Sequence, residues 1–200
     1  AEALADIRKA MVRLKHMTQQ LLTLARAEPE GARMLEMTKI DLAELIRDAL
    51  EAWTDTAISK SVDLGYDGPV SGVFVRGEPQ LLRELIGNLV DNAIRYGHKG
   101  GTVTVRLSRS PLAIAVEDDG PGIPEPDREH VTERFYRLPS SGGGGSGLGL
   151  AIAAEIASRH NATLAITAPA NGQGTTVTIS FTDGPSADLA QQPKDLAAAE

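Results

Sequence analysis

The sequence predicts an α+β protein preceded by a long N-terminal helix. Apolar residues recur every three or four positions from Leu4 to about Ala27, which is the spacing of one helix face. Beyond residue 31, short alternating or apolar runs typical of strands are separated by longer stretches with helical spacing. The 200 residues are 42% hydrophobic, which is enough for one domain of ordinary size with appendages.

The first segment, residues 1–31, is expected to be one helix and a linker. Its apolar positions form a coiled-coil seam in which Thr18 is the polar member. The stretch "AEPEG" ends the helix because it contains Pro29 and Gly31. Two interpretations remain open: an amphipathic helix lying on its own domain, or half of a helical hairpin or dimer bundle. The length of the seam favours the second.

Three more helices are predicted, at about 41–58, 78–96 and 148–159. Asp41 can cap the first of these, with Glu44 completing a capping-box pair. Strands are predicted around them at 61–66, 73–77, 101–108, 112–120, 163–168 and 175–181.

The totals exclude several classes of protein. A net charge of -7 argues against direct nucleic-acid binding, and the absence of cysteine excludes disulfides, thiolate catalysis and cysteine-based zinc sites. No apolar run approaches the roughly 20 residues of a membrane-spanning helix, and the first residues lack the pattern of a signal peptide. We therefore expect a soluble chain, which is compatible with its being a piece of a larger protein. The tail 184–200, rich in Ala, Pro and Gln, is expected to be disordered.

The predicted helix 78–96 carries an unusual polar stripe. Glu84, Asn88, Asn92 and Arg95 share one face, opposite a face of Leu and Ile. Asparagine is a mediocre helix former, so two of them on one face indicate a site. Amide oxygens suit Mg²⁺ without bringing negative charge near phosphates, and the arginine can neutralise the remaining negative charge of the phosphates.

Glycine dominates the segment 120–147 and the start of the next predicted helix. In "GSGLGLAI", residues 145–152, alternating glycines free the backbone and the chain then enters a helix. Such a turn points N–H groups outward toward phosphate oxygens. The preceding run 141–144 fits a flexible linker equally well. Although 142–147 satisfies the letters of a dinucleotide-binding fingerprint, no strand precedes it.

The segment "VEDDGPGIP", residues 116–124, ends a predicted strand in a carboxylate. An ionised Asp118 can accept a hydrogen bond from an exocyclic amine such as that of adenine. A simple Asp-Gly turn is the alternative interpretation of this motif.

Taken in order, "NLVDNAIRYG", "DDGPGIP", "ERFYR" and "GSGLGLAI" resemble the N, G1, F and G2 boxes of the sensor histidine kinase catalytic and ATP-binding domain. That domain shares the ATP fold of gyrase, the heat-shock chaperone and mismatch-repair ATPases. "GQGTTVTISF" is similar to the family's closing glycine box. The N-terminal helix, with "LLTLARAEPEG", resembles the second helix of the family's dimerisation and phosphotransfer hairpin. The resemblance implies a two-layer α/β sandwich with a mixed sheet and a mobile ATP lid, in residues 32–183.

The resemblance also implies the ligands ATP and Mg²⁺ and a set of residues for them. Asn92 would hold Mg²⁺, with Asn88 close to the metal and the phosphates. Arg95, where the family usually has lysine, and Tyr96 would face the phosphates and ribose. Asp118 would bind the adenine amine. The other implied nucleotide-binding residues are Gly120, Gly122, Phe135, Arg137, Gly145, Gly147, Leu148 and Gly149.

The expected activity is transfer of the γ-phosphate to histidine. Hydrolytic relatives have a glutamate where this chain has Asn88, and an amide cannot act as a general base. The family's acceptor histidine, followed by an acidic residue and a proline, has no match among His16, His98, His130 and His160. We therefore expect the acceptor, and with it any catalytic residue, to lie outside this sequence. An ATP-regulated binding module without phosphotransfer is the alternative, and an ATPase is a weaker one.

The expected partners are the missing hairpin and a response regulator of the winged-helix DNA-binding type. By resemblance, the full-length protein is expected to be a homodimeric bacterial inner-membrane receptor with this portion in the cytoplasm.

Overall fold

The computed structural model describes residues 37–139, 145–169 and 172–182, together with the single positions 11, 18, 20, 22 and 23, all helical. The rest of the predicted N-terminal helix, the glycine run 142–144 and the tail 184–200 lie outside the described residues. In chain order the elements are β1 (Thr38–Asp41), α2 (Leu42–Glu51), α3 (Thr54–Lys60), β2 (Asp63–Asp67), β3 (Phe74–Gly77), α4 (Pro79–Tyr96), β4 (Thr102–Arg109), β5 (Leu112–Asp118), η2 (Glu125–Asp127), η3 (His130–Thr132), α5 (Gly149–Arg159), β6 (Ala162–Thr167) and β7 (Thr175–Phe181).

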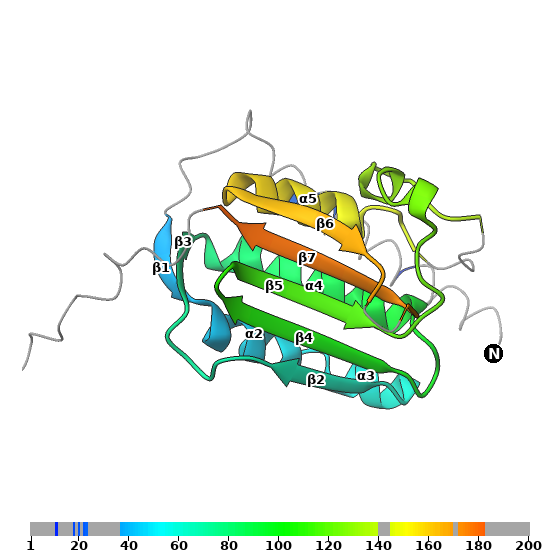
Figure 1. Cartoon of the computed structure of the whole chain (residues 1–200), viewed down its shortest axis with the longest axis horizontal. Coiled ribbons are helices and arrows are strands. Elements are labelled where there is room, and N and C mark those ends of the chain that lie inside the picture. Colours follow the sequence, from blue (N-terminus) through cyan, green and yellow to red (C-terminus); the bar gives the residue numbers. More distant parts are fainter. Residues whose placement is uncertain are drawn as a thin grey trace, which may run out of the picture.

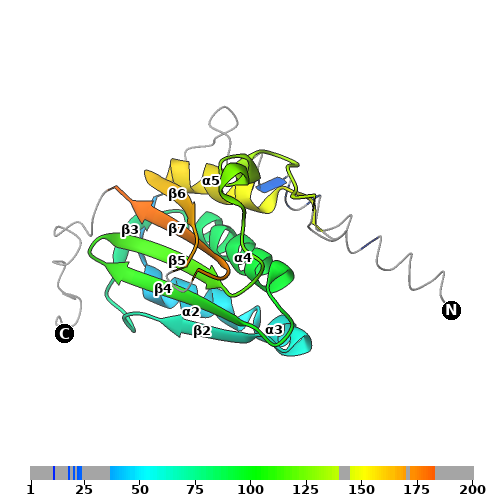
Figure 2. The same ribbon diagram turned by 45° about the vertical axis from the view of Figure 1, so that its right-hand side comes forward.

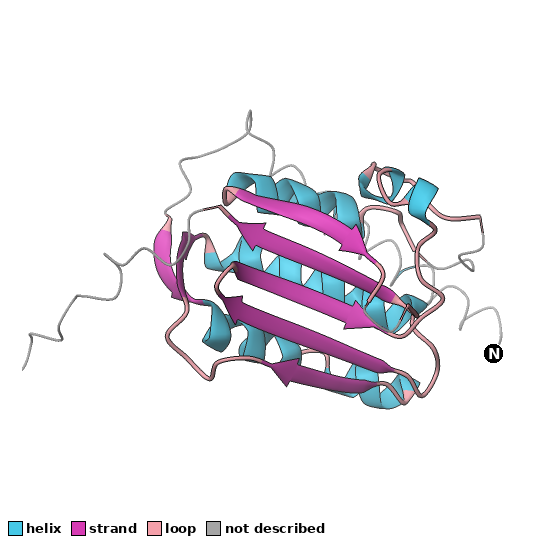
Figure 3. Ribbon diagram, viewed as in Figure 1, coloured by secondary structure: helices cyan, strands magenta, loops and turns pink. Residues whose placement is uncertain are grey.

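A five-stranded mixed sheet forms one layer, in the order β2-β4-β5-β7-β6. The pair β2 and β4 is parallel, and the other neighbours are antiparallel. Helices α2, α4 and α5 lie behind this sheet and cover one of its faces (Figures 1 and 3). Strands β1 and β3 form a separate two-stranded antiparallel sheet. The predicted two-layer sandwich with a mixed sheet is confirmed.

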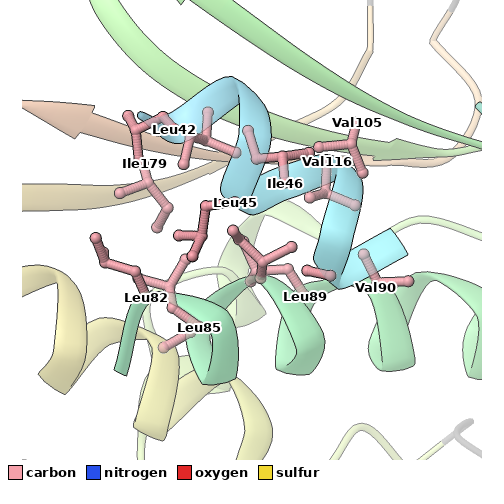
Figure 4. Packing of buried hydrophobic residues seen from close by; sticks show 14 of the residues in the cluster. Leu42, Leu45, Ile46, Leu82, Leu85, Leu89, Val90, Val105, Val116 and Ile179 are labelled. Atoms are coloured by element: carbon pink, nitrogen blue, oxygen red, sulfur yellow. The ribbon is translucent and has the colours of Figure 1, made fainter. Parts of the chain in front are cut away.

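The core lies between the sheet and its helices (Figure 4). Leu82 and Leu85 of α4 face α2, and Ile46 of α2 lies beside Val105 and Val116 of the sheet. All five are less than 3% exposed, and burying an aliphatic side chain of this size is worth about 1.5–3 kcal/mol. This packing fixes α4 on the sheet by its apolar face.

The ends of α4 agree with their sequence signals. The Glu78 carboxylate accepts the backbone N–H groups of Gln80 and Leu81, Pro79 is the first helical residue, and Gly97 follows the last. Capping groups of this kind replace the hydrogen bonds that the first turn of a helix lacks. The 18-residue helix is therefore held in register from its first turn.

The predicted helix 41–58 is two helices in the structure. Asp41 caps α2 by accepting the Ala43 N–H at 3.0 Å, but α2 ends at Glu51 and α3 begins at Thr54. The break brings Trp53 beside Gly87 of α4, where a Cβ would lie 3.6 Å from the indole nitrogen. The short strand β1 was also not predicted, because its four residues show no strand periodicity. In the part of the chain that the structure describes, no helix is long and apolar enough to cross a bilayer.

Candidate functional site

A cavity of about 310 Å³ opens between α4, the end of β5 and the start of α5. Most of the residues predicted from separate motifs meet here, although the chain places them up to 57 positions apart, from Asn92 to Gly149. Those that line the cavity are Asn92, Arg95, Tyr96, Asp118, Gly122, Arg137, Gly145, Gly147 and Gly149.

Four predicted residues do not line the cavity. Leu148 is fully buried in the hydrophobic core, so its side chain supports the loop from behind. Phe135 is 61% exposed and has a positive φ of 66°. Gly120 is buried directly behind Asp118, and Asn88 lies one turn before Asn92 on the protein side of the helix.

The two asparagines of α4 have different surroundings. Asn88 is 9% exposed, and its Nδ2 donates to the Glu84 carbonyl at 2.8 Å while its Oδ1 accepts from Gln20 Nε2 at 3.3 Å. Asn92 is half-buried and faces the cavity. The arrangement therefore favours Asn92 as the residue that offers its amide oxygen to a ligand, with Asn88 as its support.

Arg95 reaches the cavity wall next to an acidic partner. Its guanidinium pairs with the Asp91 carboxylate at 2.8 Å, and their side chains are 30% and 19% exposed. The spacing of four residues on one helix is the usual geometry for such a pair. Asp91 also lines the cavity but was not predicted; its position four residues before Arg95 was the available signal.

Asp118 ends β5 on the opposite wall. Its Oδ1 accepts the Gly120 N–H at 2.9 Å. Burial raises the pKa of Asp118, while the backbone hydrogen bonds from Gly120 and Thr175 oppose that rise. A partly desolvated carboxylate in this position gains most from a ligand that donates a hydrogen bond to it.

The glycine loop brings the start of α5 against α4. A Cβ on Gly149 would lie 3.1 Å from Asn92 Nδ2, so only glycine lets the helix approach this closely without displacing the amide. The Leu148 N–H donates to Ser146 Oγ at 3.2 Å, and both Gly147 and Gly149 face the cavity. The positive end of the 11-residue helix α5 thus begins at the cavity wall, where it favours an anion.

The segment between Pro121 and Gly147 covers one side of the cavity, and the structure describes it except for 140–144. Within this segment, the Phe135 N–H donates to the Gly147 carbonyl at 2.9 Å. The Tyr136 hydroxyl donates to Asp127 at 2.6 Å. Sequence reasoning missed several lining residues here and in β7, for which an apolar or hydroxyl residue next to a motif was the only signal: Ile123, Val131, Tyr136, Leu138, Ser146, Thr175 and Val177.

Together, the helix-backed mixed sheet, the cavity between α4 and a glycine-started helix, and the carboxylate across from them define an ATP-binding domain of the α/β sandwich type. The model of the family described as histidine kinase-, DNA gyrase B- and HSP90-like ATPase matches residues 77–185. The chain belongs to this family.

Among its relatives, the sensor protein QseC of Salmonella typhi is 34% identical over 171 residues. These cover 86% of this chain but only 37% of that protein, so the chain spans little more than a third of the length of this relative. The solved mycobacterial sensor histidine kinase MprB matches with a TM-score of 0.63 and 30% identity, over 72% of this chain and 96% of that one.

A histidine kinase named ThkA, solved in complex with the response regulator protein TrrA, matches with a TM-score of 0.72 at 20% identity, over 90% of this chain and 50% of that one. This likeness shows the fold alone.

Proposed function

We propose that this chain is the ATP-binding catalytic domain of a sensor histidine kinase, which binds Mg-ATP in the cavity and transfers the γ-phosphate to a histidine outside this sequence. The observation that carries the proposal is that one cavity has a base-recognising group at one wall and a phosphate-binding environment at the other. Asp118 supplies a hydrogen-bond acceptor at one wall, and Asn92 with the first turn of α5 supplies a metal and phosphate environment at the other.

At the adenine end, the carboxylate of Asp118 accepts the exocyclic amine. A guanine carbonyl at the same position would place two acceptors against each other, which costs a desolvated hydrogen bond. Ile123 and Val177 line the cavity near this end and offer apolar surface to a base. Gly120 supports the carboxylate from behind through its N–H.

At the phosphate end, the residues fit Mg²⁺ that is shared with phosphate oxygens. Asn92 offers an amide oxygen, and within the described residues no group of three or more His, Asp or Glu could hold an ion alone. Magnesium commonly combines one or two protein ligands with substrate phosphates and waters. Bound there, it would neutralise phosphate charge. Asn88 stays a predicted second ligand, although its contacts favour a supporting role.

Arg95, Tyr96, Arg137 and the glycine loop complete the phosphate end. Backbone N–H groups of the loop 145–149 and the positive end of α5 suit the phosphate oxygens. The guanidinium of Arg95 adds a positive charge, which its pair with Asp91 reduces. Phe135, exposed on the covering segment, is proposed to meet the phosphotransfer hairpin rather than the nucleotide.

Transfer is favoured over hydrolysis because an amide cannot act as a general base toward water. Asn88 stands at the position of the hydrolytic glutamate, and its amide is already used by Glu84 and Gln20. The acceptor must then bring its own nucleophile. A binding module without phosphotransfer has no observation in its favour.

A response regulator is the partner proposed for this chain from its likeness to sensor proteins; the ThkA structure adds only that a protein of this fold can bind such a regulator. Its winged-helix type, the homodimeric parent and the placement of this domain on the cytoplasmic side of an inner-membrane receptor are proposed from the family resemblance. The hairpin that carries the acceptor histidine is the remaining proposed partner.

The proposal is tested by titrating ATP into the chain by calorimetry with and without Mg²⁺. Asn92→Ala should weaken binding only when Mg²⁺ is present, and Asp118→Ala should abolish the preference for ATP over GTP. Asp63→Ala, an exposed carboxylate on β2, is the matched control and should change neither. Equal ATP and GTP affinity in the unaltered chain would contradict the adenine assignment.

Phosphotransfer is tested separately by adding a hairpin that carries the acceptor histidine, together with γ-labelled ATP. Label on the hairpin supports the kinase, whereas tight ATP binding without label supports a binding module. Steady release of phosphate without an acceptor would instead support an ATPase.

A further inference from the structure

Among the described residues of the N-terminal segment, Gln20 lines the cavity. Its side chain is 7% exposed and lines the cavity together with residues of α4 and the glycine loop. In Figure 2 the short blue piece of this segment lies beside α5. Gln20 precedes the catalytic fold by 17 residues, from Gln20 to Met37, so this contact joins the cavity to a part of the chain outside it.

Gln20 uses both ends of its amide. Nε2 donates to Asn88 Oδ1 at 3.3 Å, and Oε1 accepts from Ser146 Oγ at 2.6 Å. Ser146 in turn accepts the Leu148 N–H, and Asn88 donates to the Glu84 carbonyl. One continuous series of hydrogen bonds therefore runs from the first turn of α5, through Gln20, to the backbone of α4.

Only an uncharged amide satisfies both neighbours. A carboxylate would leave Asn88 Oδ1 without its donor and would bring negative charge beside a phosphate site. An aliphatic side chain would leave the buried Asn88 Oδ1 without its donor and the half-buried Ser146 hydroxyl without its acceptor. Glutamine at position 20 is therefore suited to its two hydrogen bonds, and not only to a buried position.

We propose that Gln20 is a positioning residue for the Mg-nucleotide site: it sets the distance between α4 and the glycine loop by bridging Asn88 and Ser146. The inference rests on the proposed function. A Cβ on Gly149 would lie 3.5 Å from Asn88 Oδ1 and 3.3 Å from Asn92 Oδ1, so a shift of Asn88 presses on the same turn that touches Asn92. Releasing the bridge therefore disturbs the metal ligand without touching it.

The geometry favours support of nucleotide binding over competition with it. Asn88 does not line the cavity, and its Oδ1 faces Gln20. A nucleotide held by Asn92 and the loop has no need to break this bridge. Because Gln20 contacts both Asn88 and Ser146, a displacement of Gln20 would change the position of α4 relative to the glycine loop.

The test compares Gln20→Met, which keeps length and packing but loses both hydrogen bonds, with Thr23→Val. Thr23 is buried on the same segment but does not line the cavity, so its variant controls for docking of the segment alone. Calorimetry should show Mg-ATP affinity reduced about fivefold in Gln20→Met, a loss typical of a hydrogen bond or two. Binding without Mg²⁺ should change less than twofold, and Thr23→Val should change neither.

A double-mutant cycle with Ser146→Ala identifies the route of the effect. If Gln20 acts through Ser146, the two losses will not add, whereas independent losses would overturn the bridge. Gln20→Glu retains the acceptor for Ser146 and should still reduce Mg-ATP affinity; it serves if the methionine variant fails a thermal-denaturation check.

Unchanged or tighter Mg-ATP binding in Gln20→Met would overturn the inference while leaving the proposed function standing. If the unaltered chain binds no ATP, the proposed function fails and the inference fails with it.

Discussion

Replacing Gly149 with alanine separates the binding role of the glycine loop from its structural role. A Cβ at this position would lie 3.1 Å from Asn92 Nδ2 and 3.3 Å from its Oδ1, against ordinary contacts of 3.4–4 Å. The Asn92 side chain must therefore move by a few tenths of an ångström. Gly149 is also the first residue of α5 and has no positive φ, so alanine suits the helix better by about 0.5–1 kcal/mol.

These two effects have opposite consequences. Stability in urea should stay within about 1 kcal/mol of the unaltered chain, because the helix gain offsets the crowding. Mg-ATP affinity should fall about tenfold, equivalent to about 1.4 kcal/mol, because the Asn92 amide oxygen would no longer face the position proposed for Mg²⁺. Gly65→Ala on β2, where a Cβ meets nothing within 4 Å, is the control for both measurements.

Wild-type affinity in a folded Gly149→Ala protein would refute the link between Asn92 and the metal. A loss of stability well beyond about 2 kcal/mol would instead refute the claim that the amide can yield, since crowding against a rigid neighbour is the alternative.

Three further changes have expected outcomes. Asp118→Asn should lose at least about tenfold in ATP affinity. Because burial raises the pKa of Asp118, the stability that this carboxyl contributes is complete below about pH 3.9 and is lost as pH rises through the pKa of the folded state. The variant should therefore be no less stable than the unaltered chain in urea at neutral pH. His160 Nε2 accepts the Glu78 N–H at 3.1 Å, and burial lowers the pKa of this imidazole. The stability that His160 contributes is therefore complete above about pH 6.5 and is lost as pH falls through the pKa of the folded state. Urea unfolding from about pH 8 to about pH 5 should therefore be flatter for His160→Gln than for the unaltered chain. Glu78→Ala removes the cap of α4 and should cost about 1 kcal/mol by chemical denaturation while leaving ATP affinity nearly unchanged.

The sequence was most informative where a local signal has a local cause. Glu78 and Pro79 start α4 in the structure as they do in the pattern, and Gly97 follows its end. The break at Trp53 was not predictable in this way, because it depends on the space beside Gly87 in another helix. The parallel pairing of β2 with β4 likewise joins strands separated by two other elements.

The site divides along the same line. The motifs predicted Asn92, Asp118 and the loop glycines as site residues, because each motif has a distinctive composition. The structure places these residues around one cavity. Motif reasoning placed Asn88 close to the metal and could not show that Asn88 lies outside the cavity lining, because Asn88 bonds to Gln20, 68 residues earlier in the chain. Periodicity along α4 describes which face a side chain is on, but not which other segment already occupies it.

The closest backbone approach near Asp118 comes from a residue outside the cavity. Gly174 has φ +107°, and a Cβ there would lie 1.8 Å from the Asp118 carbonyl oxygen, while a Cβ on Gly122 would meet the Gly174 carbonyl at 2.9 Å. What is crowded is main chain, so no substitution elsewhere can make room. We therefore expect only glycine to be tolerated at position 174 in a chain that still binds a purine nucleotide. Random mutagenesis screened for loss of nucleotide binding should find substitutions of Gly174 as often as substitutions of residues that touch the ligand.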